Sequence, residues 1–306
     1  MLSINTNTAS MASVNAINKS SASLSTSMER LATGNRINSS ADDAAGKQIA
    51  SRMTSQSDGM TVALRNIQDA TAMLQTADSM FDEMTDVLGR MKDLSTQAAN
   101  GTYNSDDLQA MQDEYDELGK QMSDMLENTT YGGTNLFGDA ANSNTHTSGL
   151  FTGSVQFQVG AESSDTMTVN ISSQLGGLIQ HLSGLSATFS DDWNSTDGTG
   201  SATGASGKEL MSTASANSNI SALQVAMDDV AKIQSKLGAS INRLNDTAAN
   251  LTSMQDNTDV AIGNIMDTDY ATEASNMTQQ QVLMQTGITM LKQSNSMSSM
   301  VSSLLQ

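Results

Sequence analysis

The sequence has no proline and no cysteine, and it has few aromatic residues. Among its 306 residues, aromatic side chains make up only 3%. Without cysteine, neither disulfide bonds nor thiolate metal sites can form. Without proline, no residue breaks the hydrogen-bond ladder of a helix, so very long helices are permitted. The scarcity of aromatic side chains indicates a lean core. This composition is unusual for an enzyme and suits a protein that must unfold and refold.

Positive charge is also scarce. The chain holds 14 Lys and Arg against 33 Asp and Glu, which gives a formal net charge of -19. Nucleic-acid binding draws its affinity from clustered Lys and Arg that displace counterions, so we exclude nucleic acids as partners. Residues 1–19 lack the basic region followed by an apolar run that is typical of a Sec-type signal. No stretch approaches eighteen apolar residues, so we expect no membrane insertion.

Residues that hold metals or cofactors are few and poorly placed. The two histidines, His146 and His181, stand in polar surroundings and are interpreted as loop residues. Residues 191–198 are similar to a calcium loop, but the ligand spacing is broken and the glutamate at the twelfth position is missing. Residues 207–208 read Gly-Lys as in a P-loop, but Glu209 stands where Ser or Thr would bind magnesium. We therefore expect no cofactor, no metal site and no enzymatic activity. The 22 methionines are interpreted as flexible packing residues rather than as metal or redox groups.

Hydrophobic spacing is the strongest positive signal. In residues 60–98, apolar residues alternate at steps of three and four, interrupted only by Ser95, which predicts a long helix with a heptad seam. Residues 105–128 repeat the pattern after a short link, which indicates an antiparallel hairpin. Residues 220–266 predict another helix of similar length, and we expect the three helices to pack side by side. The seam positions are Met60, Ala63, Ile67, Ala70, Leu74, Ala77, Phe81, Met84, Leu88, Met91 and Ala98 in the first segment, and Leu223, Ala226, Val230, Ile233, Leu237, Leu244, Leu251, Met254, Ala261 and Ile265 in the last.

The middle of the chain has a different pattern. Apolar and polar residues alternate in residues 155–159 and 167–171, on either side of a turn-like stretch, which predicts a β-hairpin. Residues 186–207 are small, polar and rich in glycine. We expect an exposed loop there, with little core.

Both ends carry an apolar stripe at helical spacing. A single amphipathic helix of this length is marginal in water, so we expect the ends to be poorly ordered until they pair with each other or with neighbouring chains. On the C-terminal segment a second line, Met277, Met284 and Leu291, runs beside the main stripe. The residues predicted to be buried by assembly are Ile17, Leu24, Met28 and Leu31 near the N-terminus and Leu283, Met290, Met297 and Leu304 near the C-terminus.

Several long motifs give the chain a resemblance to a known family. Residues 30–53, RLATGNRINSSADDAAGKQIASRM, closely resemble the N-terminal signature of bacterial flagellins, as do residues 2–7 and 93–102. Residues 265–295 and the terminal SSLLQ are similar to the flagellin C-terminal signature. The resemblance extends over roughly the first 138 and the last 90 residues.

The resemblance implies a mainly α fold: a long coiled-coil bundle with a small β-hairpin and a short variable outer region. In flagellins the chain ends form an inner tube, called D0, and the long helices form the next shell, called D1. The corresponding ranges here are 1–45 for the N-terminal D0 helix and the start of the connecting segment, 46–175 for the N-terminal part of D1, 176–215 for the outer region, 216–266 for the C-terminal D1 helix and 267–306 for the C-terminal D0 helix.

The resemblance also implies function. A flagellin is a structural subunit that self-assembles into the extracellular filament of the bacterial flagellum for motility, after leaving the cell unfolded through the type III export channel. The implied partners are other flagellin subunits, an export chaperone at residues 265–306, and the filament cap and hook-junction proteins. Two alternatives remain: a hook-filament junction protein of the same family, and a coiled-coil adhesin or receptor ligand that presents residues 140–210. Host innate-immune receptors recognise many flagellins at positions that match Arg90, Leu94, Gln97 and Glu114.

Overall fold

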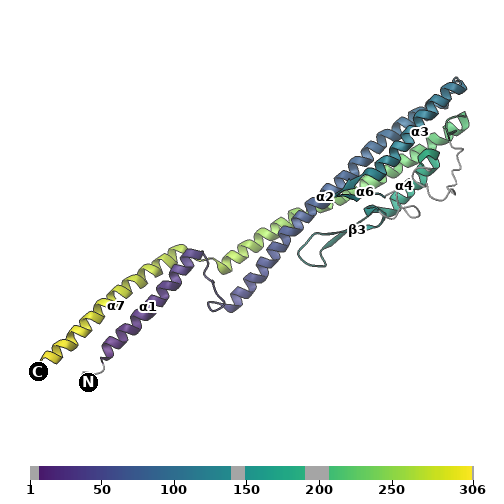
Figure 1. Ribbon diagram of the computed structural model, residues 1–306. Coiled ribbons are helices and arrows are strands. Elements are labelled where there is room, and N and C mark those ends of the chain that lie inside the picture. The colour runs from purple at the N-terminus through teal and green to yellow at the C-terminus, as the bar shows by residue number, and fades with distance from the viewer. Residues whose placement is uncertain (1–6, 139–148, 190–206, 305–306) are drawn as a thin grey trace. The chain divides into compact units, whose positions relative to one another are not determined.

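The computed structural model describes residues 7–138, 149–189 and 207–304, with side chains described up to Met297 and at Met300 (Figure 1). Two compact units share the chain: one contains the chain up to Asp58 together with the chain from Met254 onward, and the other contains Gly59–Ser253. We call them the terminal unit and the larger unit. The elements are α1 (Thr8–Thr33), α2 (Ala44–Ala98), α3 (Ser105–Asn128), β1 (Thr130–Tyr131), β2 (Thr134–Asn135), η1 (Leu150–Thr152), β3 (Ser154–Gln158), β4 (Thr166–Asn170), α4 (Ser172–Leu185), α6 (Thr213–Met266) and α7 (Tyr270–Leu304).

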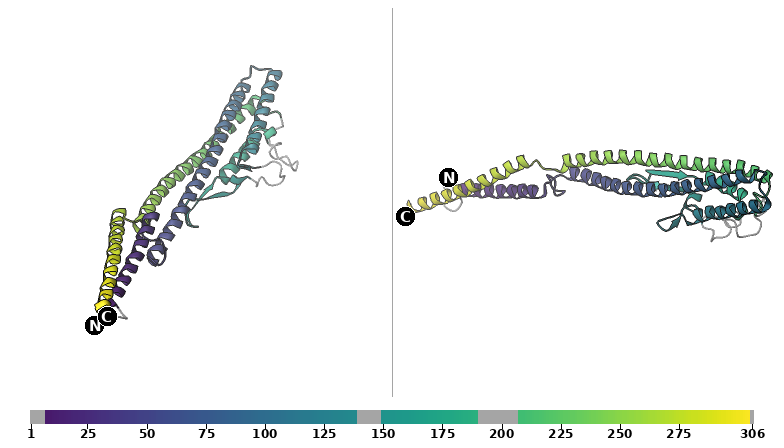
Figure 2. Two further views of the ribbon diagram at one scale, coloured as in Figure 1. Left: turned by 60° about the vertical axis from the view of Figure 1, so that its left-hand side comes forward. Right: turned by 90° about the horizontal axis from the view of Figure 1, so that it is seen from above.

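In the larger unit, α2, α3 and α6 lie side by side around one core (Figures 1 and 2). All of the seam residues predicted in residues 60–98 are buried, which confirms the heptad pattern. Ser95, the interruption, is buried too, and its hydroxyl donates to the Met91 carbonyl oxygen at 2.8 Å, so the polar group is satisfied within its own helix. The seam of α6 is buried from Leu223 to Leu251. The prediction is wrong at Met254, which is exposed because the core of this unit ends at Leu251.

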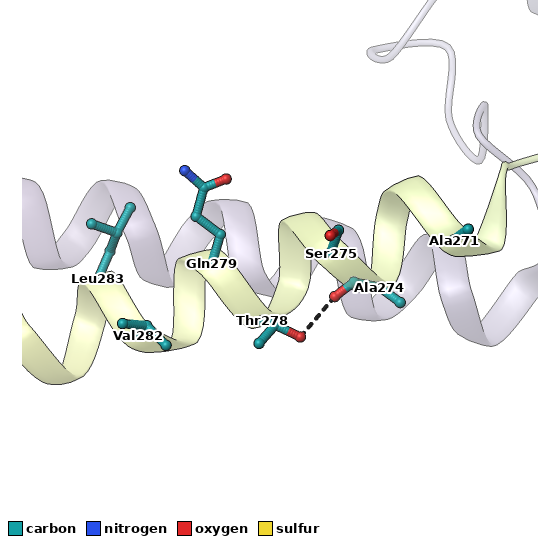
Figure 3. Close-up of a pocket in the computed structure, with 7 residues that line it drawn as sticks. All are labelled: Ala271, Ala274, Ser275, Thr278, Gln279, Val282 and Leu283. Carbon is teal, nitrogen blue, oxygen red and sulfur yellow. Dashed lines mark hydrogen bonds between the residues drawn. The ribbon is translucent and has the colours of Figure 1, made fainter.

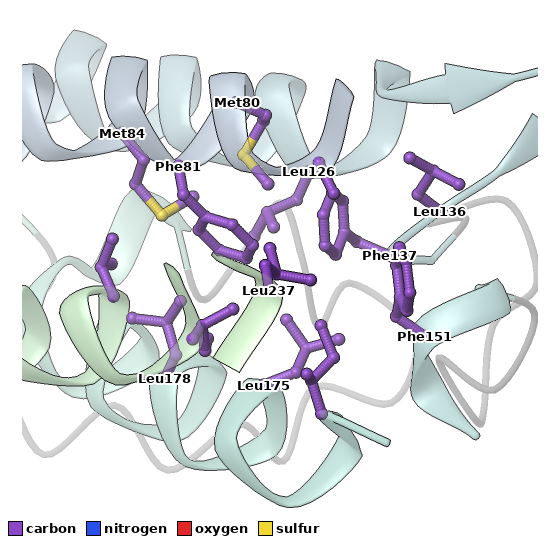
Figure 4. Packing of buried hydrophobic residues seen from close by; sticks show 14 of the residues in the cluster. Met80, Phe81, Met84, Leu126, Leu136, Phe137, Phe151, Leu175, Leu178 and Leu237 are labelled. Atoms are coloured by element: carbon purple, nitrogen blue, oxygen red, sulfur yellow. The ribbon is translucent and has the colours of Figure 1, made fainter. Parts of the chain in front are cut away.

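Three of the few aromatic residues lie together in this core. Phe81 from α2 meets Phe137 edge to face, with ring centroids 5.1 Å apart, and Phe137 lies 5.7 Å from Phe151 (Figure 4). Leu175 and Leu178 of α4 approach the same cluster from the opposite side (Figure 4). These large side chains fill the space where α4, η1 and the residues after β2 pack against the long helices.

The predicted β-hairpin is confirmed. Strands β3 and β4 pair antiparallel, with Val155 opposite Val169 and Phe157 opposite Met167. Alternate residues of β4, Met167 and Val169, are buried, as the period of two requires. The hairpin therefore lays one apolar face on the helical core.

The described parts of the outer region contain more structure than the sequence indicated. Residues 172–185 form α4, which the sequence analysis did not predict, and its leucines at steps of three and four are buried. The expectation of little core in residues 186–207 is wrong at the start, where Ser186, Ala187 and Phe189 are buried. They are buried because the chain here packs against α3, where the Thr188 hydroxyl donates to the Asp116 carbonyl oxygen. The Ala187 amide also donates to the Glu209 carboxylate. The calcium-like stretch 191–198 lies outside the described residues, as does His146.

Candidate functional site: the terminal helix pair

The two ends of the chain pair with each other in the terminal unit. Helices α1 and α7 run antiparallel and side by side (Figure 2). At one end the Asn7 side-chain amide donates to the Ser294 hydroxyl oxygen at 3.1 Å. At the other end Arg30 lies 3.9 Å from the Glu273 carboxylate, which is buried. The predicted pairing of the two chain ends with each other is therefore present within a single chain.

One line of α7 faces α1. Met277, Met284 and Leu291 are half-buried, and Gly287 on the same line approaches Ile17 so closely that an added Cβ would lie 2.8 Å from its Cγ1. The facing surface of α1 alternates Ile17, Leu24 and Leu31 with half-buried or buried serines. Small serine and glycine side chains let two helix backbones approach closely. The pair is thus held by a narrow contact rather than by a thick apolar core.

A second apolar line on the pair is left uncovered. Met28 of α1 is 50% exposed, and Leu283, Met290 and Met297 of α7 are 48%, 60% and 60% exposed. The three α7 residues stand seven apart, so they lie along one side of the helix. The structure therefore divides the predicted assembly residues: Ile17, Leu24 and Leu31 are half-buried in the pair, whereas these four face outward. The side chain of Leu304 lies outside the described residues.

Two open grooves border this uncovered line. The first runs along α7 and is lined by small residues followed by larger apolar ones: Ala271, Ala274, Ser275, Thr278, Gln279, Val282 and Leu283 (Figure 3). Within it the Thr278 hydroxyl donates to the Ala274 carbonyl oxygen at 2.8 Å, so this polar group is satisfied by its own helix (Figure 3). The second groove lies between the two helices and is lined by Ala16, Lys19, Ser20, Ser23, Gln280 and Leu283. Both are shallow surfaces that another helix could fill.

The connection beside the pair is fixed by backbone bonds. Gly34 ends α1 with a φ of +77°, and its carbonyl oxygen accepts from the Thr268 amide at 2.9 Å. An isolated antiparallel bridge joins Asn35 to Asp267, and the Arg36 guanidinium donates to the Ile265 carbonyl oxygen at 2.9 Å. The chain after α1 is thus tied to the chain before α7.

Two carboxylates hold turns in this unit. The Ser39 backbone amide, helped by that of Asn38, lowers the pKa of the Asp42 carboxyl by hydrogen bonding to the charged form. The Thr272 hydroxyl and the first amides of α7 lower the pKa of Asp269 in the same way. Asp269 therefore acts as the cap at the start of α7.

The positions matched to receptor recognition lie in the larger unit. Arg90 donates through Nε and Nη2 to the Glu114 carboxylate at 2.8 and 2.6 Å, and both side chains are about half exposed. Gln97 is exposed as well. Leu94 is only 2% exposed and belongs to the core. Three of the four matched positions, Arg90, Gln97 and Glu114, are therefore accessible on the surface, whereas Leu94 is not.

A buried polar junction in the larger unit was missed by sequence reasoning. The Glu209 carboxylate accepts from Gln112 Nε2 at 2.6 Å and from the Ala187 amide at 2.9 Å, while the Gln112 carbonyl oxygen accepts from the Leu210 amide at 2.7 Å. Burial beside this junction raises the pKa of Asp116. The one available signal was Gln112 itself, a polar residue set among the apolar positions of the second predicted helix.

The described part of the chain offers no other obvious chemical site. Within residues 7–138, 149–189 and 207–304, His, Cys, Asp and Glu form no group of three able to hold a metal ion. Over the same residues, none of the helices combines the length and apolar character needed to cross a membrane.

Comparison with known proteins assigns the chain to a family. Residues 4–142 match the bacterial flagellin N-terminal helical region, and residues 220–305 match the bacterial flagellin C-terminal helical region. Polar flagellin C of Vibrio parahaemolyticus serotype O3:K6 is 31% identical over 382 residues, covering 100% of both chains. Flagellin of Listeria monocytogenes serovar 1/2a is 30% identical over 307 residues, covering 99% of both.

One solved structure agrees at the level of the fold. A protein described as a flagellar hook-associated protein of Vibrio parahaemolyticus superposes with a TM-score of 0.54 at 16% identity, covering 74% of this chain and 100% of that one, which shows a shared fold alone. Bacillus cereus flagellin is 26% identical with a TM-score of 0.45, covering 61% of this chain and 88% of that one. Both flagellin family regions match this chain, and flagellins that align over nearly the whole chain are 30–31% identical to it. The chain therefore belongs to the bacterial flagellin family, whose members are structural subunits of the flagellar filament and not enzymes.

Proposed function

We propose that this flagellin polymerises through the uncovered line of its terminal helix pair, so that Met28, Leu283, Met290 and Met297 become buried against neighbouring copies. The observation that carries the proposal is the exposure of these four apolar side chains in an otherwise paired unit, three of them spaced seven residues apart on α7. The partner is a second copy of the same chain because filament assembly is the role of the family. Leu304 is assigned to the same line by its spacing.

The energetics favour a polymer over an isolated pair of subunits. Burying a Leu or Met side chain fully contributes about 1.5–3 kcal/mol, so completing the burial of four half-exposed ones contributes about 3–6 kcal/mol. Losing translational and rotational freedom costs about 4–15 kcal/mol on association. A single contact is therefore weak. A subunit that docks against several neighbours at once overcomes this cost, which suits open-ended, head-to-tail growth.

The roles of the chain segments follow from the same proposal. Residues 1–45 and 267–306 form the inner tube, residues 46–175 and 216–266 form the surrounding shell, and residues 176–215 face outward. The two compact units of the structure have different bounds from these segments, because they divide after Asp58 and before Met254. The start of α2 therefore belongs to the terminal unit, where the Ser57 hydroxyl donates to the Asp259 carboxylate at 2.7 Å.

Removing part of α7 tests the central proposal. Truncating residues 286–306 should abolish filaments, scored by electron microscopy and sedimentation, while circular dichroism retains the helical signal of the larger unit. A finer variant, Leu283→Gln with Met290→Gln, should also abolish filaments, whereas the control Val225→Gln on α6 should not. Val225 is similarly exposed but lies outside the terminal unit. Filaments at the yield of the unmodified protein from either terminal variant would refute the proposal.

The proposal also includes export of the subunit and its binding to accessory proteins. We place the mature protein outside the cell, reached through the type III channel of the flagellum, with a chaperone holding residues 265–306 beforehand. The uncovered apolar line supports this assignment, since a free apolar face of this kind promotes aggregation. The filament cap and the hook-junction proteins would contact the ends of the polymer. Deleting residues 277–306 should remove chaperone binding in a pull-down, and unchanged affinity would contradict the assignment.

Recognition by a host innate-immune receptor is proposed at Arg90, Gln97 and Glu114, with Leu94 supporting the surface from below. Arg90 and Glu114 form a half-exposed ion pair, which is worth little to stability but presents a fixed pattern of charge. The Arg90→Ala variant should lower the response of a receptor reporter to monomeric protein. An equal response from the variant and the unmodified monomer would exclude Arg90 from the contact.

A further inference from the structure

The most exposed and the most buried of the described methionines lie in different units. Among those whose side chains the structure describes, every strongly exposed one lies in the terminal unit: Met11, Met28, Met254, Met290, Met297 and Met300. Their exposed fractions run from 45% to 60%. The buried ones all lie in the larger unit: Met60, Met73, Met80, Met84, Met91, Met122 and Met167. The same residue type therefore has two environments in one molecule.

Solvent exposure decides how fast an oxidant in solution reacts with each group of methionines. A peroxide attacks the thioether sulfur directly: the S–O bond forms as the O–O bond of hydrogen peroxide breaks, the sulfur is oxidised by two electrons, and water leaves. The product, methionine sulfoxide, is polar where the thioether was apolar. A sulfur inside the close-packed core of the larger unit is shielded from this approach. The exposed methionine side chains of α1 and α7 lack this cover.

We propose that the exposed methionines of the terminal helix pair, Met11, Met28, Met290, Met297 and Met300, form a selective oxidation site, and that their sulfoxides block subunit assembly. The inference rests on the proposed function, because three of these residues belong to the line that assembly buries. A sulfoxide oxygen is a strong hydrogen-bond acceptor, and placing it in an apolar contact without a donor opposes burial. Oxidation therefore acts on the free subunit, and burial in the filament protects the same sulfurs.

The division of sites also predicts what oxidation leaves intact. The core methionines stay reduced, so the larger unit keeps its fold while the terminal unit loses its ability to associate. The modification is reversible, because methionine sulfoxide reductases restore the thioether. The chain thus carries a redox sensitivity located in its assembly surface even though it has no cysteine.

A residue-by-residue mass map tests the selectivity. Monomer is exposed to hydrogen peroxide for increasing times, quenched, digested and analysed by mass spectrometry for the sulfoxide fraction at each methionine. The exposed group should oxidise at least about tenfold faster than the buried group, because only the exposed sulfurs meet the oxidant without local unfolding. Similar rates in the two groups would overturn the inference, and this arm does not depend on polymerisation.

A polymerisation assay tests the consequence. Oxidised monomer should give about tenfold less filament than untreated monomer, since polar sulfoxides replace the apolar line. A variant with leucine at all five sites should polymerise equally well before and after peroxide, because leucine matches methionine closely in volume and helix propensity but has no sulfur. The matched control, Met73→Leu with Met80→Leu, should remain as sensitive as the unmodified protein. If untreated protein polymerises and oxidised protein does so equally, the inference fails; if untreated protein forms no filament, the proposed function fails instead.

Discussion

Helices α2 and α7 carry the same kind of apolar spacing but have different surroundings. The seam of α2 is buried along its whole length, whereas Leu283, Met290 and Met297 of α7 stand in solvent. The α2 seam faces α3, α6 and the hairpin of its own unit, while α7 meets a narrow, serine-rich surface of α1 that covers only one of its two apolar lines. The comparison teaches that periodicity indicates which residues share a face, but not whether the same chain supplies the cover.

The largest expected effect comes from making one substitution in both settings. Leu74→Ala should lower the free energy of unfolding of the larger unit by about 2–5 kcal/mol, because Leu74 is fully buried and its truncation leaves a cavity. Leu283→Ala should change the stability of the monomer by less than about 0.5 kcal/mol, since the side chain is exposed. Urea unfolding followed by circular dichroism measures both. Equal losses would show that the α7 line is covered within the monomer.

Buried glutamates extend the comparison to polar groups. Glu209 of the larger unit and Glu273 of the terminal unit are equally buried, but Glu209 accepts two short hydrogen bonds, whereas Glu273 meets Arg30 at 3.9 Å. Glu209→Ala should cost about 1–3 kcal/mol by leaving buried donors unpaired. Glu273→Ala should cost less, about 0.5–1 kcal/mol, because its 3.9 Å separation from Arg30 is too long for a hydrogen bond and the Arg30 side chain keeps access to solvent. The same unfolding assay ranks the two variants, and a reversed ranking would contradict the importance of the junction.

Two glycine substitutions should change stability by smaller amounts and in opposite directions. Gly34 has a φ of +77°, a conformation that an L side chain enters only with strain, so Gly34→Ala should destabilise the terminal unit by about 1 kcal/mol. Gly89 lies inside α2 with open space where a Cβ would be added. Gly89→Ala should therefore stabilise the larger unit by about 0.5–1 kcal/mol through helix propensity. Thermal unfolding of the two variants should shift in opposite directions; shifts of the same sign would exclude this backbone explanation.

The response to acid is the smallest expected difference. Burial, together with the Asp82 charge, raises the pKa of Asp78 in the larger unit, so protonation relieves an unfavourable charge as the pH falls through a folded-state pKa above 3.8. Hydrogen bonds from Ser39 and Thr272 lower the pKa values of Asp42 and Asp269 in the terminal unit, so the stability from these turns is lost only when the pH falls below 3.8.

As the pH falls from neutrality toward 3.8, the larger unit should gain slightly in thermal stability from Asp78, and the turns of the terminal unit should be unaffected. The Asp78→Asn variant should reduce the gain, because asparagine does not titrate over this range. Thermal unfolding by circular dichroism at a series of pH values measures the change. A larger unit that steadily loses stability over this window would contradict the direction inferred for Asp78.

Local patterns predicted the long helices and the hairpin because their signals are contained in the sequence of each element. The heptad seam around Leu74 repeats often enough to outweigh the single polar Ser95, and the alternation through Val169 is specific to a strand. Helix α4 was missed because it is short and contains Gly176, Gly177 and Gly184, which are weak helix formers. Its buried leucines compensate through packing that only the folded chain supplies.

The candidate site was predicted in part. The sequence identified the stripes of α1 and α7, but it could not say which residues would face the helix partner and which would stay uncovered, because that division depends on the close approach at Gly287. The Gln112 to Glu209 contact joins residues 97 positions apart and follows no local pattern. The role in a filament came from resemblance and was confirmed by the family comparison, not by periodicity.

Leu283 borders both grooves of the terminal helix pair, the one along α7 and the one between the helices. A single side chain occupies one rotamer at a time, so a neighbour that seats itself in the first groove fixes a wall of the second. Contacts made on the two sides of α7 are then linked through one residue. In the proposed filament, neighbours that dock on the two sides of α7 would therefore influence each other through the Leu283 side chain.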